Sequence, residues 1–297
     1  MQARAIFRNA AGQWRAGWRI ATLLALLAAS VLLINVVWKA AGLPGRSNSG
    51  PWTFALFTAL IAGSLLGITS LLLHGFEQRG LSAVGLALHR RAWKMTAAGA
   101  LLGSLPVGLL AGAALVFGYG SVQAGNAGAA ELPGEMLPAM LATLLLAAWE
   151  EMGLRGYLFR QLSLGLNATA AVLITAALFG LLHAGNPGAN WQGLAYTAVG
   201  GVFMAVLLLR TGSLWLLIGY HFGWNAMSSS ILGLELSGTE SSHSFYLITL
   251  AGPDWLTGGS YGFEASLPAV ISETLVLGAL LLTSRSCGRR SAPSGSP

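Results

Sequence analysis

Long apolar stretches alternate with short polar turns along almost the whole chain. The stretches are close to the about 20 residues that a helix needs to cross a bilayer. They lie at 18–38, 52–74, 93–117, 136–159, 166–183, 193–209, 214–231 and 267–283. They are too long for barrel strands and lack the apolar/polar alternation of such strands. The pattern predicts an all-α fold, a polytopic membrane bundle of about eight transmembrane helices.

The composition supports this assignment to the membrane. Only 9% of the 297 residues are charged and 55% are hydrophobic, whereas soluble domains contain roughly 25% charged residues. No segment is polar enough to form a soluble domain. We therefore expect one integral membrane domain over residues 1–290, followed by a disordered Ser/Pro/Gly tail at 291–297.

Basic residues predict the orientation in the bilayer, because Lys and Arg are enriched in cytoplasmic loops near span ends. If the N-terminus is cytoplasmic, fourteen of the sixteen Lys and Arg residues fall on the cytoplasmic side. Only Lys39 and Arg46 lie opposite. Loop 233–265 carries acidic residues but no Lys or Arg, which fits the outer side. Both termini are thus predicted to be cytoplasmic.

The net charge of +6 does not indicate a nucleic-acid partner. The basic residues lie in short turns beside apolar segments, without the basic, aromatic-rich domain that nucleic-acid binding requires. The single cysteine, Cys287, excludes an intrachain disulfide and a cysteine-based metal cluster. Richness in Ala, Gly, Arg and Trp is typical of a GC-rich bacterial source, so we expect the bacterial inner (cell) membrane.

The few charges inside the spans are the candidates for chemistry, since an ionisable residue there is costly by about 2.5–3.5 kcal/mol. Three occur together in "AAWEEMGLRGYLF", 147–159. Glu151 and Arg155 are four residues apart and can pair on one helix face. Glu150 is turned about 100° away. The spacing suggests one carboxylate neutralised by the arginine and one left for proton chemistry.

Two further spans carry polar faces with the same spacing of four residues. Phe179 and His183 share a face in "FGLLH", and His221 and Asn225 share one in "HFGWN". A carboxylate and an imidazole beside one water can act as general base, while a second imidazole and an amide can stabilise an oxyanion. These groups lie at different depths, so their convergence requires tilted, offset or partly unwound helices.

Two other intramembrane features are given roles outside catalysis. Small residues recur at helical-face spacing in 99–118, which favours close helix contact in lipid. Glu273 in the last span is expected to face a water-filled cavity or to bond a neighbouring helix.

The three motifs in order resemble those of the CPBP family, EExxxR, FxxxH and HxxxN/D. That family unites Rce1-type CAAX prenyl proteases with bacteriocin-processing and Abi proteins, and its fold is an eight-span helical bundle. The resemblance implies that Glu150 and His183 activate the attacking water. It further implies that Glu151 and Arg155 hold the geometry of the site, and that His221 and Asn225 stabilise the oxyanion.

A metal is permitted but not required by these residues. Glu150, His183 and His221 could ligate Zn²⁺ with an open fourth position. The HExxH motif of many zinc proteases is absent, and a buried Glu and His can act on water directly. We therefore expect no obligatory cofactor.

Three functions follow from these residues. The first is an intramembrane endopeptidase that cuts a membrane-anchored or amphipathic peptide substrate near the lipid interface. The second is a proton- or ion-coupled transporter, since intramembrane Glu, His and Arg also build proton relays; the polar residues have no matching set in the first three spans, which counts against it. The third is a non-catalytic scaffold or immunity protein with the same fold.

Overall fold

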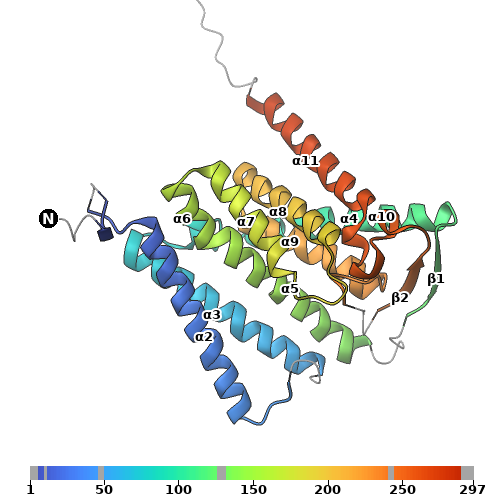
Figure 1. Cartoon of the computed structure of the whole chain (residues 1–297), viewed down its shortest axis with the longest axis horizontal. Coiled ribbons are helices and arrows are strands. Elements are labelled where there is room, and N and C mark those ends of the chain that lie inside the picture. The colour runs from blue at the N-terminus through green and yellow to red at the C-terminus, as the bar shows by residue number, and fades with distance from the viewer. Residues whose placement is uncertain (1–5, 10–11, 46–49, 126–131, 240–243, 289–297) are drawn as a thin grey trace, which may run out of the picture.

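The computed structural model of the chain is mostly helical (Figure 1). It describes residues 6–9, 12–45, 50–125, 132–239 and 244–288. The tail at 291–297, predicted to be disordered, lies outside the described residues.

Each of the eight predicted apolar segments lies on helical structure. The helices are α2 (Ala16–Ala40), α3 (Pro51–Glu77), α4 (Ala92–Val116), α5 (Leu137–Glu151), α6 (Leu158–Gly165), α7 (Ala168–Leu182), α8 (Trp191–Thr211), α9 (Leu214–Asn225), the short α10 (Asp254–Thr257) and α11 (Leu267–Gly288). Five helical segments within the described residues are long and apolar enough to cross a membrane. The protein is therefore a polytopic helical membrane protein.

Two of the predicted spans are irregular where they carry polar motifs. A π-helical segment, Met152–Tyr157, follows α5 directly, and Gly156 within it has non-helical angles (φ −84°, ψ −119°). A second π-helical segment, Ala226–Ile231, follows α9 directly. Such segments are frequent at functional sites because they change the direction in which side chains project.

Helices α4 and α9 pack with their backbones almost in contact. A Cβ added at Gly99 or Gly103 of α4 would collide with main-chain atoms of α9, and one at Gly219 or Gly223 would collide with α4. The Ser104 hydroxyl also donates to the Gly223 carbonyl across this interface, at 3.1 Å. The small residues predicted to mediate packing in 99–118 thus do so here, and they fix the helix that carries His221.

A buried ionic cluster holds the first two helices against α6. Glu77 at the end of α3 contacts Arg160 of α6 at 2.6 Å and Arg19 of α2 at 3.3 Å. Its carboxylate also accepts a hydrogen bond from the Gln161 amide. Because the carboxylate has cationic and amide partners at once, its burial is compensated.

The prediction of an exclusively helical fold is wrong for two short segments. Strands β1 (Gly120–Ala124) and β2 (Tyr246–Leu250) form an antiparallel pair, with Val122 opposite Ile248. Both are five residues long, and β1 is largely exposed and carries no hydrophobic pattern. The pair ties the end of α4 to the segment between α9 and α11 (Figure 1).

Candidate active site

The ion pair expected within the first motif is present and buried. Arg155 Nη1 lies 3.1 Å from Glu151 Oε1, and both side chains are inaccessible to solvent. The second terminal nitrogen of Arg155 donates to the Gly201 carbonyl of α8 at 3.2 Å. The guanidinium also lies over the Phe179 ring of α7, 4.5 Å from its centroid. Arg155 thus joins α5, α7 and α8 at one point.

His221 of α9 bridges the two adjacent glutamates of α5. Its Nδ1 lies 3.0 Å from Glu151 Oε1, and its Nε2 lies 3.8 Å from Glu150 Oε2. An ionised carboxylate accepts only, so Nδ1 carries the proton in the bond to Glu151. This contact fixes the ring and directs Nε2 toward Glu150.

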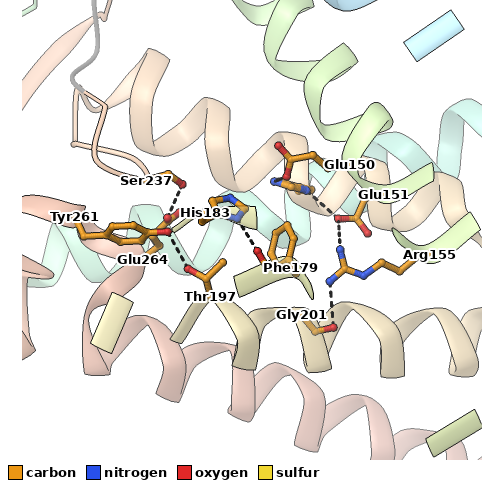
Figure 2. A network of polar contacts seen from close by, with 11 residues as sticks. Glu150, Glu151, Arg155, Phe179, His183, Thr197, Gly201, Ser237, Tyr261 and Glu264 are labelled. Atoms are coloured by element: carbon orange, nitrogen blue, oxygen red, sulfur yellow. Dashed lines mark hydrogen bonds and ion pairs between the residues drawn. The ribbon is translucent and has the colours of Figure 1, made fainter. Parts of the chain in front are cut away.

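His183 is oriented by its own motif. It caps the end of α7, and its Nδ1 donates to the Phe179 carbonyl at 2.7 Å, which leaves Nε2 as the acceptor in the neutral ring. The Phe179 ring makes edge contacts with His183 and with His221, at centroid distances of 4.9 and 5.9 Å. Figure 2 shows His183 and Glu150 on the same side of the Phe179 ring.

Glu150 is the carboxylate without a strong partner. Its Oε2 is buried and has no hydrogen-bond partner among the described residues, although the side chain as a whole is 18% exposed. Buried polar atoms are usually hydrogen-bonded, so an exception in a polar site needs an explanation, of which a function is one. The arrangement agrees with the spacing argument, in which Glu151 pairs with Arg155 and Glu150 does not.

Asn225 is the motif residue with the fewest contacts. It ends α9 one turn beyond His221 and is partly buried. Among the described residues, none is within hydrogen-bond distance of its side chain. The structure thus brings Glu150, Glu151, Arg155, Phe179 and both histidines together, while the contribution of Asn225 stays a prediction.

The described residues contain no preformed group of metal ligands. Within the described part of the chain, no group of three or more His, Cys, Asp or Glu side chains is arranged to hold a metal ion. The Nδ1 atom of each histidine is bonded to a protein oxygen, which leaves both Nε2 atoms available. The expectation that no cofactor is obligatory stays a prediction.

A second polar group borders the site and was not expected from the sequence. The Ser237 hydroxyl donates to Glu264 Oε1 at 2.6 Å, and the Tyr261 hydroxyl lies 3.3 Å from Thr197 Oγ1 of α8. Figure 2 shows this group beside His183. Ser237, Tyr261 and Glu264 come from the segment between α9 and α11, which carried no motif. The only signal was an acidic residue in a loop without Lys or Arg.

Burial perturbs the two titratable groups of this segment. It raises the pKa of the Tyr261 hydroxyl to about 12. Burial also raises the pKa of the Glu264 carboxyl above its ordinary value, against the opposing effects of the Ser237 hydrogen bond and of His183. Tyr261 is therefore neutral, and Glu264 ionises at a higher pH than an exposed glutamate.

One comparison with known proteins identifies the domain that contains the three motifs. Residues 132–227 match the family model described as type II CAAX prenyl endopeptidase, Rce1-like. No curated protein and no solved structure matches the chain. The matched segment runs from the start of α5 through α9, so it includes every motif residue described above, and it implies a protease. Residues 132–227 therefore form an Rce1-like domain of the type II CAAX prenyl endopeptidase (CPBP) family.

Proposed function

We propose that the protein is an intramembrane endopeptidase in which Glu150 and His183 activate the attacking water. The observation that carries the proposal is the buried oxygen of Glu150, which has no hydrogen bond within the described residues and lies 3.8 Å from His221 Nε2. Arg155 is paired with Glu151 and does not neutralise Glu150. The Glu150 carboxylate is therefore suited to take a proton from water. The family match supports a protease.

The reaction follows from the two acceptors. Water held between Glu150 and the Nε2 atom of His183 gives up a proton to this pair as its oxygen attacks the peptide carbonyl carbon. The tetrahedral intermediate then breaks its C–N bond, and the same proton passes to the leaving nitrogen. The products are a new amine and a new carboxylic acid, which gives its proton to the amine or to solvent, and the site returns to its starting protonation.

The remaining motif residues hold the geometry and stabilise charge. Arg155 neutralises Glu151, and Glu151 in turn fixes His221 through Nδ1. As an imidazolium between two carboxylates, His221 can donate from Nε2 to the developing oxyanion. The Asn225 amide, one turn away on α9, is the second proposed donor. Both donors lie on one helix, whose position against α4 is fixed by glycine contacts.

The proposed setting is the bacterial inner membrane, with eight spans and cytoplasmic termini. The basic residues near span ends support this orientation. A site enclosed by α5, α7 and α9 suits a substrate that reaches it from the bilayer, such as an amphipathic peptide or a membrane-anchored protein.

The test is hydrolysis by the full chain in lipid vesicles. An internally quenched fluorescent peptide library should be cleaved, and mass spectrometry should find a new carboxyl and a new amino terminus. His183→Ala should abolish cleavage, because it removes one of the two proton acceptors. His74→Ala, at an exposed histidine in the last turn of α3, is the matched control. Full activity of His183→Ala would refute the proposal.

A further inference from the structure

The segment between α9 and α11 is fixed to the site at several points. The Phe263 ring stacks on Trp224 of α9, next to Asn225, with centroids 6.4 Å apart. The Gln192 amide of α8 donates to the Ala265 carbonyl at 3.3 Å. Glu264 lies between these two anchors, so its position is determined by packing on α8 and α9.

A close approach on the α7–α8 side fixes the same segment. A Cβ at Gly193 would lie 2.8 Å from the Tyr261 ring. The Tyr261 carbonyl also accepts from the Gly238 N–H at 2.7 Å. The segments that carry Ser237 and Glu264 are thus both fixed by contacts with neighbouring residues, so the fold determines the position of this hydrogen bond.

The carboxyl of Glu264 faces the motif residues. It interacts electrostatically with His183, His221 and Glu150, and Figure 2 shows His183 between Glu264 and Glu150. One oxygen is bonded to Ser237. Among the described residues, the other oxygen has no hydrogen-bond donor, and no Lys or Arg pairs with the group. Glu264 is partly buried, so a cationic ligand can reach this oxygen and would stabilise the ionised form of the carboxyl.

The charge of the surroundings favours a cationic ligand over an anionic one. Glu150, Glu151 and Glu264 lie around the histidines. The guanidinium of the first motif is already bound to Glu151 and to a carbonyl. A positive group beside His183 would therefore be attracted, and a free carboxylate would be repelled.

We propose that Glu264, oriented by Ser237, is a specificity-determining residue that binds a cationic side chain of the peptide substrate close to the scissile bond. This inference rests on the proposed endopeptidase function and adds the substrate class to it. The predicted substrates carry Lys or Arg within a few residues of the cleaved bond. The hydroxyls of Ser237, Tyr261 and Thr197 supply neutral hydrogen-bonding groups around the bound cation.

The experiment compares pairs of peptides that differ only by Lys or norleucine at one position, and the position is moved step by step along the residues beside the scissile bond. Norleucine keeps the aliphatic chain of Lys and removes the charge. The ratio of kcat/KM for the two peptides is measured for the wild-type chain in lipid vesicles. We expect a preference for Lys of about tenfold, which corresponds to about 1.4 kcal/mol. Glu264→Gln should bring the ratio to about one, and Ser237→Ala should lower it. Glu235→Gln, an exposed carboxylate of the same segment, should leave it unchanged.

A binding measurement separates this inference from the proposed function. Fluorescently labelled Lys and norleucine peptides are titrated into Glu150→Ala vesicles, with and without Glu264→Gln. Tighter binding of the Lys peptide that disappears in Glu264→Gln would support the inference even if the wild-type chain cleaved nothing. Cleavage without a Lys preference, or with a preference that Glu264→Gln retains, would overturn the inference and leave the peptidase intact. Equal binding and no cleavage would overturn both.

Discussion

Replacing Arg155 by Met should destabilise the protein far more than any exposed charge substitution. The guanidinium is buried, pairs with Glu151 at 3.1 Å and donates to the Gly201 carbonyl at 3.2 Å. Removing one member of a buried pair costs about 3–5 kcal/mol, because the other charge remains buried. His221 still contacts Glu151 in the variant, so we expect a loss near the lower end, about 3 kcal/mol.

The assay is equilibrium unfolding in mixed micelles, followed by far-UV circular dichroism and tryptophan fluorescence. The matched control is Arg90→Met, an exposed arginine that should change the free energy of unfolding by less than about 0.5 kcal/mol. The double variant Glu151→Gln, Arg155→Met should lose less free energy of unfolding than the two single variants lose together, by at least about 1 kcal/mol. A loss below about 1 kcal/mol for Arg155→Met, or strict additivity, would refute the account of this pair.

Three further predictions test other parts of the structure. Gly103→Leu should lower the free energy of unfolding by about 1–3 kcal/mol, because it forces α4 away from α9, and should reduce peptide cleavage. Gly112→Leu, with nothing near its Cβ position, should do neither. Equal stability of the two variants would contradict the close packing of α4 on α9. Treatment with 1,10-phenanthroline should leave cleavage unchanged, and loss that Zn²⁺ restores would show a metal requirement. The preference for Lys should weaken as pH falls, because only the ionised form of Glu264 attracts the cation. The decline should start above the ordinary titration range of glutamate, because burial raises the pKa of Glu264. A preference that stays constant down to pH 4 would exclude an ionised Glu264 as its cause.

Local spacing was sufficient to predict the helices and the ion pair. Apolar length located every long helix, because in a bilayer the helix must satisfy its own backbone. The four-residue spacing placed Arg155 beside Glu151 and Phe179 beside His183, which the structure contains. These relations depend only on residues of the same helical segment.

Relations between distant segments were harder to predict. The contact of His221 with Glu151 joins residues 70 positions apart, and sequence patterns suggested convergence without its geometry. The short strands β1 and β2 were missed because most of their stability comes from pairing with each other. Glu264 was missed because its place beside His183 depends on how Phe263 and Ala265 pack on α8 and α9.

The central claim is that Glu150 acts on the water that hydrolyses the peptide bond. Its most direct test is kcat for the Glu150→Gln variant in lipid vesicles, with folding checked by the free energy of unfolding. Removing a general base costs about 10²–10⁴-fold in rate, so kcat should fall by at least about 100-fold while the fold stays intact. Glu135→Gln, in the π-helical segment Leu132–Met136 that precedes α5, should keep the wild-type rate. A folded Glu150→Gln variant that cleaves at the wild-type rate would contradict the account.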